Sequence, residues 1–165
     1  MSVDTMEQLL LEKLSDLYSA EIQIMMALPQ MARAAHSKEL NVALKQHLEE
    51  TGRQIDRLGR IFAILEKSPG GKTCEAMKVL LQQCVQVLVK ARKEGALRDA
   101  AMSLAAQRVE HYEMAGYAAA RMYAEILGHT DVAQLLQVTL DEEKTADKNL
   151  AQIAKAAHVQ TPRAA

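Results

Sequence analysis

The sequence predicts an all-α protein, and two features of its composition support this fold class. Hydrophobic residues make up 49% of the 165-residue chain but aromatic residues only 3%, so the core is expected to be aliphatic and rich in helix formers. Seven Gly and three Pro leave few positions at which a helix must end, so the helices should be long and the loops short. A chain of this size is expected to form one domain, over residues 1–165.

The first helix is expected from about Val3 to about Ala35, because apolar residues recur along this segment at helical spacing. Asp4 and Glu7, three residues apart, have the spacing of a capping box at its start. Pro29 predicts a kink, since proline removes one hydrogen bond and crowds the preceding turn.

The second helix is expected from Ser37, a residue type that caps helices well, to about Lys67. Residues 68–71, Ser-Pro-Gly-Gly, should end it. A shorter third helix is expected next, capped by Thr73 and ending near Lys93.

A fourth helix is expected from about Leu97 to about Leu127, and its many Ala residues would let neighbouring helices approach closely. A fifth helix should start at Thr130 or Asp131, after a glycine that ends the fourth, and run to about Ala157.

The lengths of the links predict how these helices are arranged. Tight turns join the first helix to the second and the fourth to the fifth, whereas the short third helix lies in the long link between the pairs. Two antiparallel hairpins joined by a long crossover form the ferritin-like version of a four-helix bundle, here with five helices in all. An up-down bundle with a fifth helix appended is the alternative. Residues 158–165 are expected to form a frayed tail.

Charge and segment pattern argue against several classes of partner and location. The net charge of −1 and the lack of a basic stripe argue against nucleic acid as a partner. No stretch approaches 18 uncharged apolar residues, and the N-terminus lacks the pattern of a signal peptide, so a cytoplasmic protein without a membrane span is expected. Cys74 and Cys84 would lie about 15 Å apart along one helix, too far for a disulfide.

Acidic residues occupy positions where the helical pattern calls for apolar ones. Glu21 continues the apolar line of the first helix and Glu143 that of the fifth, where Asp147 follows one turn later. A carboxylate in a dry bundle core is costly unless a cation meets it. Few Lys or Arg face inward, so the pattern indicates bound metal.

Polar side chains on the other two long helices can reach the same layer. His47 and Glu50 lie at the edge of the apolar stripe of the second helix, and Glu110 and Glu113 border the Ala-rich face of the fourth. Oxygen-rich clusters with a His suit Fe or Mn, and two divalent ions would offset about four carboxylate charges. The predicted metal ligands are Glu21, His47, Glu50, Glu110, Glu113, Glu143 and Asp147.

Each of these residues also has an interpretation without metal. Glu21 could be a core acid paired with Arg53 or Arg108, and His47 an ordinary hydrogen-bonded bundle histidine. Taken alone, Glu50 and Glu110 would be charges on solvated helix faces, as most helical Glu are.

Four stretches of the chain, one on each long helix, resemble the YciE/YciF family of bacterial stress proteins. They are LLLEKLSDLYSAEIQ, HLEETGRQIDRL, AAQRVEHYEMAGY and TLDEEKTADKNL. The resemblance covers nearly the whole chain. It implies a ferritin-like five-helix fold, a homodimer, and kinship with rubrerythrin-type proteins that hold two iron ions between carboxylates.

The chain departs from the general di-iron pattern at both histidines. That pattern has a Glu on the first helix, E-x-x-H on the second, a Glu on the third and E-x-x-H on the last. Arg53 stands where the first His is expected, and Ala146 where the second is expected. His47 and Asp147 could replace them from the same helix faces, which keeps a metal site but favours harder ions.

Three hypotheses for function follow. The first is a dinuclear Fe or Mn protein that acts on O2 or peroxide in a stress response, with Tyr18 or Tyr112 relaying an electron. The second is a metal-binding or structural stress protein without turnover, in which the metal stabilises the bundle. The third is a helical interaction module whose core acids pair with Arg53 and Arg108.

Overall fold

A computed structural model of the chain describes residues 4–91 and 95–159, and five helices lie within these ranges. Four are long and the third is short, as the sequence predicts. The helices are α1 (Met6–Ala34), α2 (Lys38–Ile64), α3 (Glu75–Lys90), α4 (Ala96–Ile126) and α5 (Thr130–Val159).

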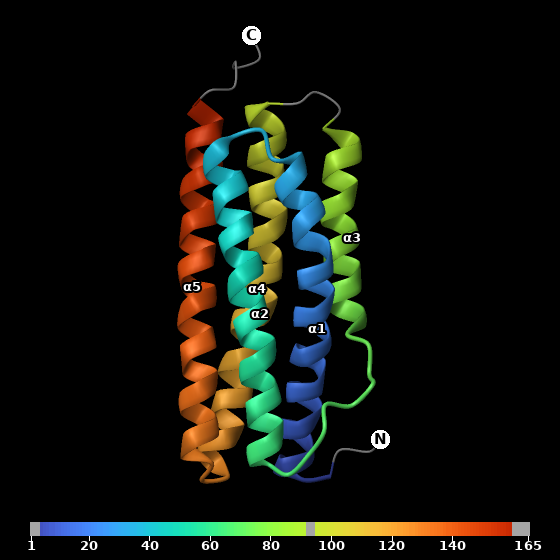
Figure 1. The fold of residues 1–165 in the computed structure, drawn as a ribbon, viewed down its shortest axis with the longest axis vertical. Coiled ribbons are helices and arrows are strands. Elements are labelled where there is room, and N and C mark those ends of the chain that lie inside the picture. The colour runs from blue at the N-terminus through green and yellow to red at the C-terminus, as the bar shows by residue number, and fades with distance from the viewer. Residues whose placement is uncertain (1–3, 92–94, 160–165) are drawn as a thin grey trace.

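The path of the chain decides between the two predicted arrangements. The link after α2 and the upward run of α3 return the chain to the end of the bundle where α2 begins, so α4 runs parallel to α2 (Figure 1). A simple up-down bundle would make these two helices antiparallel. The ferritin-like arrangement of two antiparallel hairpins and a crossover is therefore confirmed, with α3 packed outside the bundle against α1 and α4.

The ends of α1 and α2 differ from the predicted ones by a few residues. Thr5 caps α1, and its hydroxyl accepts the Gln8 amide at 3.2 Å while the Gln8 side chain accepts the Thr5 amide at 3.1 Å. The capping box is thus Thr5–Gln8, one residue after the predicted pair. At the end of α2, Glu66 adopts a left-handed conformation (φ 54°) and ends the helix at Ile64, before Lys67.

The remaining helix ends show similar shifts. The thiol of Cys74, next to the predicted Thr73, accepts the Met77 amide and caps α3. The predicted end of α3 near Lys93 lies outside the described residues. Pro29 does not end α1, which continues to Ala34. In α5 the helix continues through residue 159, so the tail predicted from 158 is helical for its first two residues, and 160–165 lie outside the described ranges.

A clamp at one end of the bundle ties α4 to the turn between α1 and α2. The buried carboxylate of Asp99, in the first turn of α4, accepts the amides of His36 and Ser37 at 2.8 and 2.6 Å. Arg98 donates to the carbonyl oxygen of Ala34 at 2.7 Å. Two backbone donors and one acceptor that the turn leaves open are satisfied by another hairpin, so the clamp fixes how the hairpins dock.

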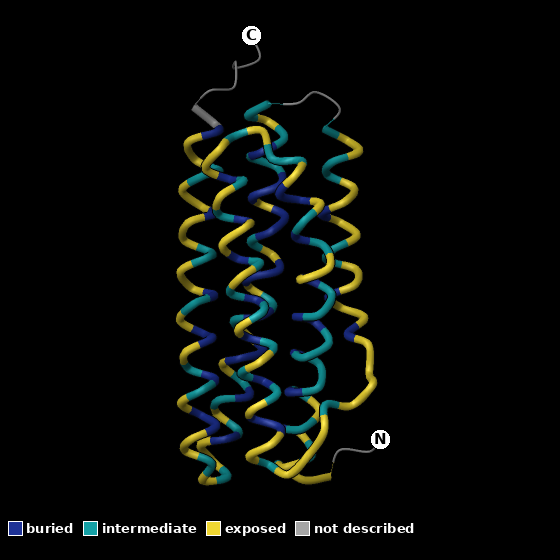
Figure 2. Tube along the Cα trace, in the orientation of Figure 1, coloured by how far each residue is buried: buried dark blue, intermediate teal, exposed yellow. Residues whose placement is uncertain are grey.

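Buried residues line the inner faces of the helices, and the outer faces are mostly exposed (Figure 2). The buried stripe of α1 is rotated from the predicted line, because Ile24 is buried whereas Met25 is 37% exposed. Close approach of α4 is visible at Gly116, where an added Cβ would lie 2.8 Å from Leu17.

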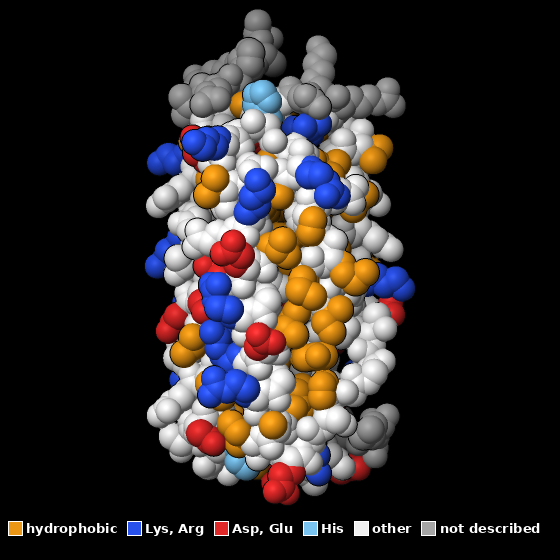
Figure 3. Space-filling model, viewed as in Figure 1, with side chains coloured by type: hydrophobic (Ala, Val, Ile, Leu, Met, Phe, Trp, Pro, Cys, Tyr) orange, Lys and Arg blue, Asp and Glu red, His pale blue; other side chains and the backbone are white. Residues whose placement is uncertain are grey.

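The outer face of α1 carries apolar side chains that the monomer leaves partly exposed. A band of hydrophobic side chains runs over α1 in Figure 3. At helical spacing along α1, the half-buried or exposed residues that we call the α1 stripe are Leu11, Tyr18, Ile22, Met25 and Pro29.

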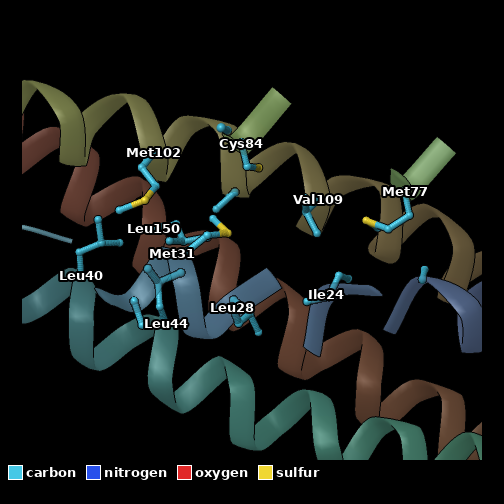
Figure 4. Close-up of a cluster of buried hydrophobic side chains, with 14 of the residues drawn as sticks. Ile24, Leu28, Met31, Leu40, Leu44, Met77, Cys84, Met102, Val109 and Leu150 are labelled. Atoms are coloured by element: carbon cyan, nitrogen blue, oxygen red, sulfur yellow. The ribbon is translucent and has the colours of Figure 1, made fainter. Parts of the chain in front are cut away.

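The buried core consists of two hydrophobic clusters stacked along the bundle. The first, here the Met102 cluster, includes Ile24, Leu28, Leu44, Met102 and Leu150 (Figure 4). The second, here the Phe62 cluster, includes Leu14, Leu17, Phe62, Ala120 and Leu136. On α2, α4 and α5, buried polar side chains lie between these clusters, and on α1 the buried Glu21 follows Ala20, where the two clusters meet.

Both cysteines are buried, and neither forms a disulfide, as predicted. Within the described ranges, the structure has no helix long and apolar enough to cross a membrane.

Candidate metal centre

Four carboxylates from three helices lie in the buried layer between the two hydrophobic clusters. Glu21 comes from α1, Glu110 and Glu113 from α4, and Glu143 from α5. Glu110 is 2% exposed and the other three are fully buried. Helical periodicity explains why they converge, since each replaces an apolar residue on the inward face of its helix. We call these four residues the carboxylate layer.

The second helix contributes an imidazole and two neutral polar groups to the same layer. His47, Thr51 and Gln54, at i, i+4 and i+7, are all buried and share the inward face of α2. The Nε2 atom of His47 lies 3.4 Å from Oε1 of Glu110. The imidazole therefore meets the carboxylates directly.

The donor atoms of four residues converge closely enough for a metal ion. His47, Glu110, Glu113 and Glu143 each offer one ligand atom, and these atoms all lie within 4.8 Å of one another. Ligand bonds of about 2.1 Å place opposite ligands of one ion about 4.2 Å apart. The buried group could therefore hold a metal ion with small side-chain adjustments.

Several donor atoms in the layer make no hydrogen bond within the described part of the chain. They include both oxygens of Glu113, one oxygen each of Glu21, Glu110 and Glu143, and both ring nitrogens of His47. The described residues place no Lys or Arg in an ion pair with the four carboxylates. Unpartnered buried acceptors in this number are what a cation site requires and an ordinary core avoids.

The pKa values of the four carboxyl groups also indicate that the layer needs a cation. Burial raises the pKa of Glu21, Glu110 and Glu113 well above the usual range, and repulsion from neighbouring carboxylates adds to the shift. Burial also raises the pKa of Glu143, although hydrogen bonds from Glu110 and Gln54 oppose it. Without a cation the layer would hold protons, so its charged form needs a positive partner.

Hydrogen bonds hold two of the carboxylates in place. The buried phenol of Tyr117 donates to Oε1 of Glu21 at 2.5 Å. Gln54 donates to Glu143 and, at 3.1 Å, to Glu142. The guanidinium of Arg57 donates two hydrogen bonds, of 2.9 and 3.0 Å, to the same Glu142. The carboxylates are thus oriented from α2 and α4.

Tyr117 is a site residue that was not predicted from the sequence, although its spacing on α4 was a signal for it. Tyr117 lies four residues after Glu113 and seven after Glu110, on the same face of α4. The two tyrosines named as electron relays lie elsewhere. Tyr112 donates to Asp16 at 2.5 Å, and Tyr18 packs against the Phe62 ring at 6.1 Å between ring centres.

Three predicted ligands lie outside the converging group: Glu21, which lies beside it in the carboxylate layer, and Glu50 and Asp147, which make other contacts. Glu50 is half-buried, and its carboxylate accepts from Gln46 at 2.9 Å and lies 3.9 Å from Arg53. Asp147 accepts from Gln107 at 2.7 Å and lies 3.0 Å from Nε2 of His111, at the seam between α4 and α5.

Neither arginine considered as a partner for Glu21 contacts it. Arg53 lies beside Glu50, and Arg108 donates to Gln83 of α3 at 3.1 Å. The unpaired state of Glu21 is the expected one for a metal ligand rather than for a core ion pair.

Comparison with known proteins identifies the family. The sequence matches the family described as a domain of unknown function, DUF892, over residues 5–162. The chain belongs to this family. It is 39% identical over 158 residues to the protein YciF of Escherichia coli K12, and the match covers 93% of each chain. The resemblance to the YciE/YciF family is therefore confirmed.

Solved structures of DUF892 relatives support the fold. The crystal structure of the Escherichia coli stress protein YciF superposes with a TM-score of 0.92 at 37% identity, over 96% of this chain and all of that one. YcfI of Rhodopseudomonas palustris, for which a structural role has been suggested, gives 0.85 at 40% identity, over 91% of this chain and 95% of that one.

In this DUF892 chain, Arg53 and Ala146 stand where the di-iron pattern has histidines. The two residues predicted to replace those histidines, His47 and Asp147, have different surroundings. Arg53 faces outward, 56% exposed, and His47, six residues earlier, supplies the imidazole of α2. On α5, Asp147 occupies the face predicted for a substitute ligand but contacts His111, a residue that the sequence analysis did not single out.

Proposed function

We propose that this protein is a ferritin-like stress-response protein that binds two divalent metal ions, Fe or Mn, in the carboxylate layer. The observation that supports this most strongly is the convergence of four buried carboxylates that pair with no Lys or Arg in the described ranges. Burying one unpaired carboxylate already costs several kcal/mol, so four of them imply a ligand.

Two ions fit the layer better than one. His47, Glu110, Glu113 and Glu143 form the converging group, and Glu21 is close enough to raise the pKa of Glu113 by repulsion. Glu21 therefore adds oxygen donors for a second ion beside the first. Two divalent ions carry four positive charges, which match the four carboxylates.

The donor set selects the kind of metal. One imidazole and four carboxylates favour hard or borderline ions such as Mn²⁺ and Fe²⁺, whereas soft ions prefer thiolates. Neither buried cysteine belongs to the converging group. The two unpaired thiols also suit a reducing compartment, and we place the protein in the cytoplasm.

Metal analysis tests this proposal. Protein purified without chelator should contain about two Fe or Mn ions per chain, and apo protein should bind Mn²⁺, measured by loss of the free-ion electron paramagnetic resonance signal. Glu113→Ala and Glu143→Ala should lose this binding. Glu49→Ala, at an exposed position of α2, is the matched control and should bind as the wild type does. Folded wild-type protein that binds neither ion would overturn the proposal.

Reaction with peroxide is the activity that this centre fits best. Two bound divalent ions would supply the two electrons that, with two protons, reduce one hydrogen peroxide molecule to two water molecules. The buried Tyr117 phenol donates a hydrogen bond to Glu21 beside the centre, and burial raises the pKa of the phenol, so it keeps its proton and orients Glu21. Metal-loaded protein should consume peroxide faster than the same concentration of free metal. Equal rates would exclude this activity.

A metal-stabilised protein without turnover is the second proposal for function, and the structural role suggested for YcfI supports it. The four long helices each supply a side chain to the layer, so a bound ion would link all of them. Chelation should then lower the melting temperature sharply, while metal-loaded protein consumes neither O2 nor peroxide.

We also propose that the chain forms a homodimer through the α1 stripe. On α2, Gly52 and Gly59 have open space around them and would let another helix approach. Light scattering should give twice the chain mass of 18.2 kDa. Ile22→Glu, which places a charge in the stripe, should give monomers, whereas an unchanged mass would contradict this interface.

A further inference from the structure

The seam between α4 and α5 contains a polar pair that the proposed metal centre does not use. His111 and Gln107 of α4 both contact Asp147 of α5, and the Oδ1 atom of Asp147 lies 3.0 Å from Nε2 of His111. The side chain of His111 is 60% exposed and that of Asp147 is 22% exposed. The pair therefore lies at the surface, with Asp147 more buried than His111.

This pair adjoins the buried carboxylate layer. Gln107, Glu110 and His111, at i, i+3 and i+4, share one face of α4, so the Asp147 that both flanking residues contact lies beside Glu110. Asp147 also follows Glu143 by one turn of α5. Glu110 is 2% exposed, and its Oε2 atom makes no hydrogen bond in the described ranges. An unpartnered buried oxygen thus lies next to a solvent-accessible imidazole and carboxylate.

The other flanks of the layer are closed by different contacts. Between α2 and α5, the paired hydrogen bonds of Arg57 to Glu142 close the seam, and the guanidinium neutralises the carboxylate that a cation would need. On the side covered by α3, Tyr112 bonds to Asp16 and lies against the cap of α3. Next to His47, the guanidinium of Arg53 stands beside Glu50 and repels cations. Of these flanks, only the α4–α5 seam presents a carboxylate and an imidazole without an Arg beside them.

We propose that His111 and Asp147 form a transit site through which divalent metal ions pass from solvent to Glu110 and the carboxylate layer. This inference rests on the proposed metal-binding function. The 3.0 Å between the two atoms matches neighbouring ligands of one ion, which bonds of about 2.1 Å place about 3 Å apart. With only two protein ligands, the ion keeps most of its water and is held weakly, so it moves on to the richer donor set inside.

The test separates the rate of loading from the final amount bound. Apo protein is mixed with Co²⁺ in a stopped-flow instrument, and the visible absorbance of bound Co²⁺ is followed to its end point. His111→Ala and Asp147→Asn should slow loading by about tenfold or more, the lower end of what local charge and ligands contribute to association rates. The final amount of Co²⁺ bound should equal that of the wild type.

Two control variants make the comparison specific. His129→Ala removes a histidine from the α4–α5 turn, at the end of the bundle, and should load at the wild-type rate. Glu49→Gln, at an exposed position of α2, tests that side and should also load normally. Unchanged rates in His111→Ala and Asp147→Asn would overturn the transit site. A lower end point in Asp147→Asn would also overturn it, since Asp147 would then be a ligand of the centre. Wild-type protein that binds no Co²⁺ would overturn the centre itself.

Discussion

The Phe62 cluster and the carboxylate layer are neighbours in one bundle, yet they affect stability in opposite directions. In the cluster, buried aliphatic and aromatic side chains gain free energy by leaving water. In the layer, four buried carboxylates lose hydration and repel one another, and their pKa values rise as a result. The hydrophobic clusters therefore stabilise the fold, whereas the layer weakens it unless a cation is bound.

The largest effect is expected from truncating the cluster. Phe62→Ala removes a fully buried ring and should lower the free energy of unfolding by about 3–5 kcal/mol. Urea denaturation measures this loss. It should be nearly the same in chelator and in saturating Mn²⁺, because the effects of separate sites add. A loss that depends strongly on metal would show that the two regions are not independent.

The reverse result is expected in the layer. In chelator, Glu21→Leu replaces a buried carboxylate with an apolar side chain and should leave the apo protein at least as stable as the wild type, with a gain of up to about 1–4 kcal/mol. Glu49→Leu, at an exposed site of α2, should change stability by less than about 0.5 kcal/mol. A clear loss for Glu21→Leu in urea denaturation would contradict this account of the layer.

A smaller effect is expected from pH, because protonation removes the charge but leaves a polar carboxyl group in the core. The pKa values of Glu21, Glu110 and Glu113 are raised in the folded chain, so the folded state holds more protons above the usual value of 4.5. The stability of the apo protein should therefore fall as pH rises from about 5 to 8, the window just above the usual carboxyl pKa. With Mn²⁺ bound the trend should reverse, since the metal needs deprotonated ligands. Urea denaturation at both pH values, with and without Mn²⁺, checks both signs.

The smallest effect is expected at the end of the bundle, far from the layer. Ser37 caps α2 by accepting the Leu40 amide at 3.2 Å, so Ser37→Ala should cost about 1 kcal/mol. This cost should not change with metal or chelator. If Ser37→Ala cost no stability in chelator, the state of the layer would affect the stability of the whole bundle and not only of the residues around it.

Helical periodicity was sufficient to predict both the fold and most of the site. Glu21 and Glu143 stand in apolar lines of their own helices, so a single helix already shows that they are buried. The packing of one helix against another was harder to predict. The contact of Asp147 with His111 depends on the relative rotation of α4 and α5, which side chains on both helices set together.

Short-range details were missed for a related reason. The capping boxes at Asp4–Glu7 and Thr5–Gln8 have the same spacing, and only the backbone conformation at Thr5 selects the second. The buried face of α1 includes Ile24 rather than Met25, because two neighbouring apolar residues fit the period almost equally well. Tertiary contacts decide such cases, and a pattern along one helix does not contain them.

The clamp at Asp99 has a consequence for how the chain is made. During synthesis the first hairpin leaves the ribosome before the fourth helix, so Asp99 can accept the amides of His36 and Ser37 only after α4 has been made. Because a single aspartate then holds both amides, a second hairpin that docks one turn out of place cannot form the clamp. The clamp therefore forms only when the two hairpins dock as they do in the folded protein.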